Sequence, residues 1–196
     1  MTEQGETIQA KQYMPILLEI EIDNLFVDTY GHWAESKISE AYTKNLVSGE
    51  SKTRFVPDRE ITRAEFVAML VRAAEMRPQK YEDVFADVNG EEWYARYMQA
   101  AYEGGIVKEV YVRPNDFITR EEMCDMVVRA YERDGEAYAS ELSFDDIANI
   151  SDKVSVSKAF GLGVISGYDD NTFRPQNGLT RAEAVTVIIN YHNLKG

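Results

Sequence analysis

The amino-acid sequence predicts an all-α fold made of three tandem helix-loop-helix units. Four short motifs recur three times in the same order, at intervals of about 59 residues, which indicates an internal repeat. Within each unit, apolar residues follow the spacing of three and four that marks one face of a helix. Each second helix also begins with the same capping signature. A lone pair of helices does not bury its apolar faces, so we expect the three units to pack on one another.

The recurring motifs divide the chain into a leader and three units. In chain order they are an aromatic-x-aspartate start (Phe26-Val27-Asp28, Phe85-Ala86-Asp87, Phe144-Asp145-Asp146), a turn (Leu46-Val47-Ser48-Gly49, Ile106-Val107-Lys108-Glu109, Ile165-Ser166-Gly167), a proline motif (Phe55-Val56-Pro57, Val112-Arg113-Pro114, Phe173-Arg174-Pro175) and a capping motif (Thr62-Arg63-Ala64-Glu65, Thr119-Arg120-Glu121-Glu122, Thr180-Arg181-Ala182-Glu183). These motifs place the units at residues 25–80, 81–138 and 139–196. The leader, residues 1–24, contains Leu17-Leu18-Glu19-Ile20-Glu21-Ile22, whose alternation is typical of a strand and fits the tail of a preceding domain.

Each unit is predicted to contain a first helix after the Trp33 position and a second helix after the capping motif. In unit one, the first helix is expected to carry apolar residues at Ile38, Ala41, Tyr42 and Leu46 and to end at Gly49. Thr62 stands at an N-cap position, and Glu65 can return a hydrogen bond to it, which makes a capping box. The second helices have apolar faces at Phe66, Val67, Leu70, Val71 and Ala74, at Met123, Cys124, Val127, Val128 and Tyr131, and at Ala184, Val185, Ile188 and Ile189. Because Cys124 lies on such a face, we expect a core side chain and not a nucleophile.

The charge and composition narrow the classes of function. The chain has 34 Asp and Glu against 21 Lys and Arg, and its formal net charge of −13 disfavours a nucleic-acid partner, because phosphate binding needs a basic face. The 44% hydrophobic and 28% charged residues are typical of a globular protein. Cys124 is the single cysteine, which excludes an internal disulfide. His32 and His192 are too far apart in sequence to suggest a zinc site, so no metal or cofactor is expected.

The sequence shows neither a membrane anchor nor an export signal. Its longest apolar stretch, Met14–Leu18, falls short of the roughly 20 residues that cross a bilayer, so membrane insertion is not expected. Residues 1–6 lack the basic and apolar regions of a secretion signal. We therefore expect either a protein made without such a signal or a fragment or processed form.

Taken together, the motifs resemble the S-layer homology (SLH) domain family. The resemblance covers residues 25–196 and rests on the four motifs and on the segment Gly31-His32-Trp33-Ala34. Such domains commonly occur in threes. The resemblance implies a pseudo-threefold helical bundle whose grooves between repeats bind secondary cell-wall polysaccharide, often with pyruvate ketals on N-acetylmannosamine. It also implies a monomeric, extracellular module that tethers surface proteins or exoenzymes non-covalently to the cell wall or S-layer.

Three arginines are the first candidate ligand-binding residues. Arg63, Arg120 and Arg181 each follow an N-cap threonine directly. We expect each guanidinium to lie beside unpaired amide donors at the positive end of a helix dipole, which is a site for an anion. Arginine is also suited to binding a carboxylate through two parallel N–H bonds, and a pyruvate ketal would offer one. The alternative is a solvated residue at the start of a helix.

Two tryptophans and two turns are the remaining candidates. Trp33 and Trp93 could present an apolar face to the ring C–H groups of a sugar, with packing between repeats as the alternative. The turns Ser48-Gly49 and Ser166-Gly167 could bring backbone N–H groups close to a ligand, because glycine has no side chain in the way. Both glycines are also candidates for helix C-caps. Gly31 joins this set from the Gly-His-Trp segment.

Other polar residues of the motifs are expected to be structural. The aspartates of the first motif are predicted to cap or staple the first loop of each unit, with ligand contact as the alternative; they are Asp28, Asp87 and Asp146. His32 is predicted to have a structural role inside the same loop.

The three copies differ at the candidate positions. Unit one is the most complete and keeps Gly31, Trp33, Ser48, Gly49, Arg63 and Arg72. Unit two keeps Trp93, Arg120 and Arg129 but has Lys108 and Glu109 in the turn, where a glutamate would repel an anion. Unit three keeps Ser166, Gly167 and Arg181 but has Ser151 at the tryptophan position and Asn190 at the Arg72 position. We therefore predict that not every groove binds, that the site using Arg63 is the strongest, and that the turn with Glu109 is inactive.

Two other classes of function compete with anchoring. A protein-protein assembly module of a surface layer would use the helical faces to contact a partner protein. A carbohydrate-active enzyme would need two carboxylates about 5 to 10 Å apart, and 34 acidic residues make such a pair easy to find by chance. The sequence has no nucleophile elbow, phosphate loop or metal motif, and Glu65, Glu122 and Glu183 are already assigned to caps. We therefore predict a non-catalytic binding module.

Overall fold

The computed structural model describes residues 26–195. Their regular elements are the helices α2 (Glu35–Thr43), α3 (Arg63–Ala73), α4 (Ala95–Glu103), α5 (Arg120–Tyr131), α6 (Lys153–Gly161) and α7 (Arg181–Asn193) and the short 3-10 helix η1 (Ile147–Asn149). Over this range the extended segments pair only as isolated bridges. The all-α prediction is therefore confirmed, whereas the predicted strand in the leader lies outside the described residues.

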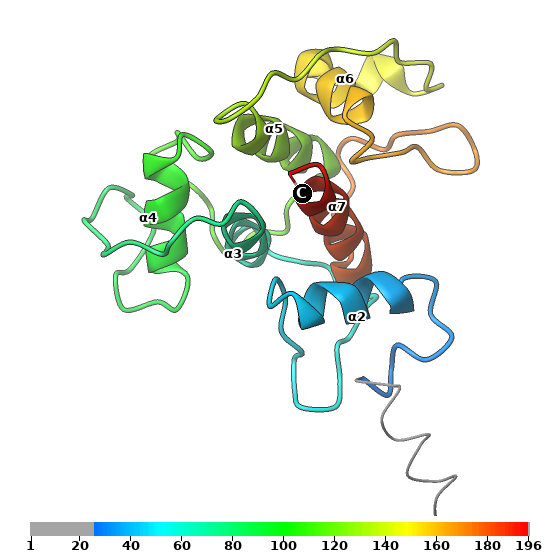
Figure 1. Cartoon of the computed structure of the whole chain (residues 1–196). Helices are drawn as coiled ribbons and strands as arrows, with labels where there is room; N and C mark the ends of the chain where they lie inside the picture. Colours follow the sequence, from blue (N-terminus) through cyan, green and yellow to red (C-terminus); the bar gives the residue numbers. More distant parts are fainter. Residues whose placement is uncertain (1–25, 196) are drawn as a thin grey trace, which may run out of the picture.

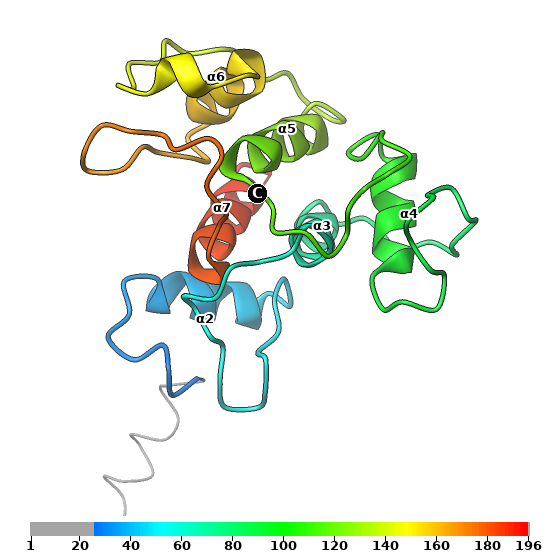
Figure 2. The ribbon, with the colours of Figure 1, turned by 180° about the vertical axis from the view of Figure 1, so that it is seen from behind.

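The second helices of the three units form the centre of the molecule, and the first helices surround them. Figures 1 and 2 show α3, α5 and α7 at the middle, with α2, α4 and α6 outside. Each outer helix packs on the second helix of the preceding unit: α4 on α3, α6 on α5, and α2 on α7. The contact between α2 and α7 joins the first and third units, so the three units close into a ring.

A ring of backbone hydrogen bonds stands at the centre of this arrangement. Ile61 N–H donates to Leu179 O (2.9 Å), Leu179 N–H donates to Ile118 O (3.3 Å), and Ile118 N–H donates to Ile61 O (3.2 Å). All three side chains are fully buried. Because these residues precede the capping threonines of the three units, the ring fixes where the second helices start. Each donor and acceptor is satisfied only when all three units are present.

The predicted capping boxes form in all three units. At α3, the Thr62 hydroxyl accepts from Glu65 N–H (3.3 Å), and Glu65 Oε2 accepts from Thr62 N–H (2.9 Å). The same reciprocal pair forms at the starts of α5 and α7. Cys124 is fully buried on α5, and burial raises the pKa of its thiol, as expected for a core side chain.

The predicted staple by the motif aspartates is also confirmed. Asp28 accepts from the N–H groups of Phe55 (2.8 Å) and Val56 (2.9 Å) in the proline motif of the same unit. Asp87 and Asp146 accept from the equivalent pairs of N–H groups. Val56 has a φ of 59°, in the left-handed region that a β-branched residue avoids, so the aspartate holds a turn that would otherwise be unfavourable.

The predicted end of the first helix is wrong. Helix α2 stops at Thr43, and Asn45, with φ 58°, takes the left-handed position that terminates a helix. Gly49 lies farther along, where a Cβ atom would stand 2.4 Å from the Phe26 ring. Gly167 lies in the same way against Phe144, at 2.6 Å. These glycines therefore let the turn approach the aromatic ring of the first motif and do not cap a helix.

Candidate functional site

Two cavities between the units form grooves, and each takes residues from all three units. We call them groove A and groove C, and we call the equivalent place in unit two groove B. Groove A contains the turn 48–50, α3, Arg181 and Trp93, and its cavity has a volume of about 250 Å³. Groove C contains the turn 163–169, α7, Arg120 and Trp33, and its cavity has a volume of about 700 Å³. Groove B is the equivalent place in unit two, with the turn 108–109, α5 and Arg63.

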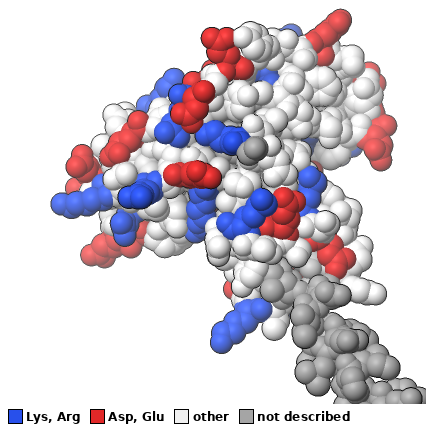
Figure 3. All heavy atoms as spheres, viewed as in Figure 1, with Lys and Arg blue, Asp and Glu red and all other residues white. Residues whose placement is uncertain are grey.

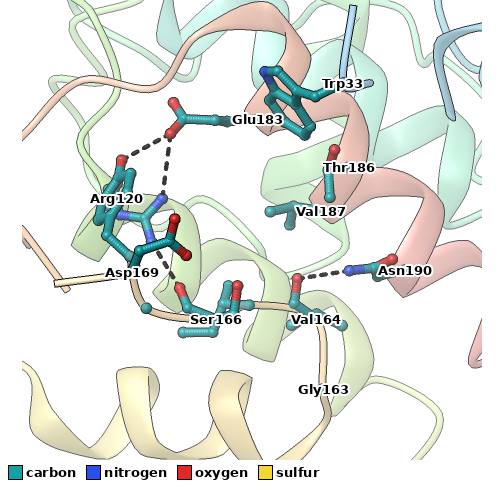
Figure 4. A pocket seen from close by; sticks show the side chains of 13 residues that line it. Trp33, Arg120, Gly163, Val164, Ser166, Asp169, Glu183, Thr186, Val187 and Asn190 are labelled. Atoms are coloured by element: carbon teal, nitrogen blue, oxygen red, sulfur yellow. Dashed lines mark hydrogen bonds and ion pairs between the residues drawn. The ribbon is translucent and has the colours of Figure 1, made fainter. Parts of the chain in front are cut away.

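Groove C is built around the guanidinium of Arg120 (Figure 4). Arg120 Nη2 donates to Ser166 O (3.0 Å) in the turn, and Nη1 lies 3.8 Å from Glu183 Oε1 on α7. The Tyr168 ring lies under the same guanidinium, with its centroid 4.6 Å from the central carbon, and the Tyr168 hydroxyl donates to Glu183 (2.7 Å). Trp33 stands on the opposite wall and is 64% exposed. The groove thus has a fixed cation on one side and an open indole face on the other.

Groove A repeats this geometry with residues of other units. Arg181 Nη2 donates to Ser48 O (2.9 Å), and Nη1 lies 3.6 Å from Glu65 Oε1. Trp93 is 57% exposed and lines the same cavity. Burial lowers the pKa of Arg181 and outweighs the opposing charge of Glu65. The guanidinium remains charged at neutral pH, because the ordinary pKa of arginine is far above it. The exposure of both indoles favours sugar contact over packing between repeats.

Groove B has Lys108 and Glu109 where the other two grooves have a serine and a glycine, and it has Asp125 on α5. Glu109 Oε1 lies 3.6 Å from Arg129 Nη1, and Asp125 Oδ2 lies 2.9 Å from Arg129 Nη2. Burial would raise the pKa of Glu109, but hydrogen bonds to the backbone and the charges of Arg129 and Arg63 outweigh it, so its pKa is lowered. The acidic turn is therefore ionised at neutral pH and pairs with the cation of its own groove.

The predicted unpaired amides beside the arginines are not present. Arg63 N–H donates to Asp116 O (2.9 Å), and Ala64 N–H donates to Pro114 O (2.9 Å), both in the loop of the next unit. The first-turn amides of α5 and α7 are paired in the same manner. The prediction of an open amide site is therefore wrong, because the adjoining unit satisfies these donors.

The three arginines are buried and held by carbonyl groups. Arg63, Arg120 and Arg181 are 4%, 7% and 4% exposed, so they are not solvated residues at a helix start. Each Nε donates to the carbonyl of the next proline motif: Arg63 to Val112 (2.7 Å), Arg120 to Phe173 (2.8 Å) and Arg181 to Phe55 (2.9 Å). Each guanidinium thus has a fixed orientation at the edge of its groove.

The sequence grouped the candidates of unit one together, and the structure separates them. The turn Ser48-Gly49 lies in groove A, and Trp33 lies in groove C. Arg63 lies in groove B, where it forms an ion pair with Glu122 (2.9 Å). Arg63, expected to mark the strongest site, therefore belongs with the Glu109 turn, expected to be inactive. The reason is that each arginine points out of its own unit into the groove of the next one.

The other candidates and two residues that sequence reasoning missed are also placed. Ser166 and Gly167 line groove C. Gly31 lies in the loop ahead of Trp33 with φ 70°, and its N–H donates to Glu35 Oε2 (2.9 Å). His32 accepts from Ala34 N–H through Nδ1 (3.1 Å), which agrees with a structural role. Tyr168 and Asp169 were missed, although they directly follow the turn.

No metal site or membrane span emerges from the described residues. Between residues 26 and 195, His, Cys, Asp and Glu side chains do not gather in groups of three that could hold a metal ion. In the same part of the chain, every helix is too short or too polar to cross a bilayer.

The comparison with protein families gives three matches along the chain. The sequence model of the S-layer homology domain matches residues 25–67, 84–124 and 143–185. Each match begins at the aromatic-x-aspartate motif and runs into the second helix of a unit. Each match thus lies within one of the three units.

Several known proteins contain a similar segment. An amylopullulanase of Thermoanaerobacterium thermosulfurigenes is 37% identical over 175 residues, which is 86% of this chain and 9% of that protein. The exoglucanase XynX of Acetivibrio thermocellus is 39% identical over 83% of this chain and 16% of its own length. The S-layer protein sap of Bacillus anthracis is 28% identical over 80% of this chain and 20% of its own length. The chain therefore spans no more than a fifth of each of these relatives.

Proposed function

Since the chain belongs to the S-layer homology domain family, in three tandem copies, we propose that it anchors a protein to the bacterial cell wall by binding secondary cell-wall polysaccharide in grooves A and C. The family places the chain outside the cell, at the cell wall. The ligand we propose carries a carboxylate on a sugar, as a pyruvate ketal does.

The observation that carries this proposal is the pairing of an exposed tryptophan with a fixed arginine in two of the three grooves. Trp33 faces Arg120 across groove C, and Trp93 lines groove A with Arg181. An indole face contacts the C–H groups of a sugar ring, while a guanidinium binds a carboxylate. A pyruvylated sugar presents both features on one residue. The two contacts together therefore select an acidic sugar over a neutral sugar or a free anion.

The net charge of the chain is compatible with an anionic ligand. Charges of both signs are interspersed over the face in Figure 3. Repulsion from distant carboxylates is screened beyond about 10 Å at ordinary ionic strength, whereas an arginine acts within contact distance. The formal charge of −13 therefore opposes binding of a continuous polyanion without preventing recognition of separate carboxylates.

We propose that groove B does not bind. Glu109 and Asp125 place two carboxylates around Arg129, so the cation that would attract a ligand is already paired. At the tryptophan position, unit three supplies Ser151, which has no apolar face to offer a sugar. Groove B thus lacks the indole on which the proposal for the other grooves rests, and the carboxylate of Glu109 interacts with its fixed arginine, Arg63.

Co-sedimentation with cell-wall sacculi tests the proposal. We expect the protein to pellet with sacculi, and to remain in solution when the ketals are removed or when Trp33→Ala and Trp93→Ala are combined. Tyr111→Ala is the matched control, because Tyr111 is 69% exposed and lies outside grooves A and C. Equal binding to walls with and without ketals would contradict the proposed ligand.

We assign no catalytic role to this segment. The two enzymes named above align with it over only 9% and 16% of their length, so their activities are not attributed to these residues. A role in protein assembly is the second candidate, favoured by exposed aromatic side chains outside grooves A and C, namely Tyr30, Tyr111 and Tyr138. Oligomers of the isolated chain in sedimentation velocity would favour assembly, whereas a monomer that binds sacculi favours anchoring.

A further inference from the structure

Two facing positions carry different residue pairs in groove A and in groove C. The first position lies on the second helix, at Arg72 in unit one and at Asn190 in unit three. The second lies one helical turn after the tryptophan, at Tyr97 on α4 and at Lys37 on α2. In groove A, Arg72 Nη2 donates to the Tyr97 hydroxyl (3.0 Å). In groove C, Lys37 Nζ donates to Asn190 Oδ1 (2.8 Å).

The positively charged side chain therefore comes from opposite walls in the two grooves. Arg72 brings the charge from the second helix in groove A, with a neutral tyrosine opposite; Lys37 brings it from the first helix in groove C, with a neutral asparagine opposite. The second-helix side chains keep the same anchor, since Arg72 Nη1 donates to Leu46 O (3.4 Å) and Asn190 Nδ2 donates to Val164 O (3.2 Å). Both contacts thus lie at the same depth, directly before the turn.

We infer that Lys37 is the second ligand-binding cation of groove C and replaces the arginine that groove A has at Arg72; this inference rests on the proposed binding function. Asn190 lines the cavity, and its oxygen contacts the ammonium, so Lys37 stands at the cavity wall behind one amide group. An ammonium has three N–H donors, and one of them reaches Asn190. The group can therefore bind Asn190 and an anion at the same time.

The charges of the grooves support this assignment. Groove A is lined by Arg72 and Arg181 against the carboxylates Glu50 and Glu65. The cavity wall of groove C has Arg120 alone against two carboxylates, Asp169 and Glu183. Adding Lys37 gives groove C the same balance as groove A. Without Lys37, groove C would be net negative and would repel an acidic sugar.

Ligand binding can be measured in each groove separately, because each groove has one tryptophan and the chain has no others. In a Trp93→Phe background, tryptophan fluorescence reports groove C through Trp33; in a Trp33→Phe background, it reports groove A through Trp93. The probe is purified secondary cell-wall polysaccharide that carries pyruvate ketals. Lys37→Met removes the charge and keeps the aliphatic stem. The matched control is Lys44→Met, which makes the same change on the flank of α2, where Lys44 lies 3.9 Å from Glu40.

We expect Lys37→Met to weaken binding in groove C about tenfold or more, the effect of losing a charge-assisted hydrogen bond, and to leave groove A unchanged. Lys37→Tyr combined with Asn190→Arg, which installs the pair of groove A, should restore binding in groove C, whereas a merely structural role predicts no such rescue. If Lys37→Met and Lys44→Met change the affinity of groove C equally, the inference about Lys37 is overturned while the proposed function stands. The absence of any Trp33 or Trp93 response in the two backgrounds would overturn the proposed function and the role of Lys37 with it.

Discussion

Arg181 Nη1, in the third unit, lies 3.6 Å from Glu65 Oε1, in the first. The same relationship links each arginine of a capping motif to the capping glutamate of the next unit, with Arg63 2.9 Å from Glu122 and Arg120 3.8 Å from Glu183. Each glutamate also caps its own helix. A single carboxylate thus joins local helix capping to the closure of the ring.

Arg181→Met should lower the free energy of unfolding by about 3 kcal/mol, because it breaks a buried ion pair and leaves its partner groups without their donor. The carbonyl oxygens of Ser48 and Phe55 lose hydrogen bonds in the same variant. Chemical denaturation measures the change. Lys44→Met, which breaks an exposed pair, should cost less than about 1 kcal/mol. Equal effects of the two substitutions would show that the Arg181 contacts do not stabilise the ring.

The protein should lose stability as the pH falls below the ordinary glutamate pKa of about 4.3. Burial would raise the pKa of Glu65, but hydrogen bonds from Arg59 and Thr62 and the charges of Arg59 and Arg181 lower it. Burial would raise the pKa of Glu122, but the hydrogen bond that its carboxylate accepts from Thr119 N–H and the interactions with Arg63 and Arg113 lower it. The unfolded chain therefore binds more protons than the folded one in this range, and the stabilisation present above it is lost with acid.

Glu65→Gln tests the origin of this acid sensitivity. The amide keeps an acceptor for Thr62 N–H but removes the charge. We expect the variant to be less stable than the wild type at neutral pH and the difference to shrink as the pH falls toward the lowered pKa of Glu65. A difference that stays constant from neutral pH to acid would assign the effect to other carboxylates. Thermal unfolding at a series of pH values provides the measurement.

Gly49→Ala should destabilise the chain by about 1–3 kcal/mol, because the new Cβ would stand 2.4 Å from both Phe26 Cε1 and Ser51 O. The turn should shift, and binding in groove A, read through Trp93, should weaken. Gly105→Ala is the control: its φ of 69° costs about 1 kcal/mol, but nothing lies within 4 Å of its Cβ. Unchanged Trp93 binding in Gly49→Ala would show that the turn does not shape groove A.

In a chain that carries Ser151→Trp, which supplies the indole that groove B lacks, Glu109→Ser should create binding in groove B. In a chain whose grooves A and C are disabled by Trp33→Ala and Trp93→Ala, removing this carboxylate relieves repulsion of an anionic sugar at contact distance. We expect affinity for sacculi to rise at least about tenfold. Glu132→Ser in the same background is the control. It also removes a carboxylate, but one that pairs with Lys158 and not with Arg129, so it should have no such effect. Equal affinities of the two variants would mean that Glu109 is not what blocks groove B.

Much of the fold could be predicted from the sequence, because its determinants act inside one unit. The capping boxes join residues three apart, and the aspartate staples join two motifs of the same unit. Helical periodicity likewise placed Cys124 in the core. Gly49 was misassigned as a helix end, because the local pattern shows where a glycine stands but not that the Phe26 ring of the same unit packs against it.

The composition of the grooves was decided only by the tertiary structure. The sequence determined that the chain has three units and which kinds of side chain each one offers, since recurring motifs and local capping show both. It did not determine that Arg63, Ser48 and Trp33 of one unit would enter three different grooves. Nor did it show that Lys37 stands opposite Asn190. The physical reason is that each groove forms where three units meet, and closure of the ring, through contacts such as that of α2 with α7, has no local signal along the chain.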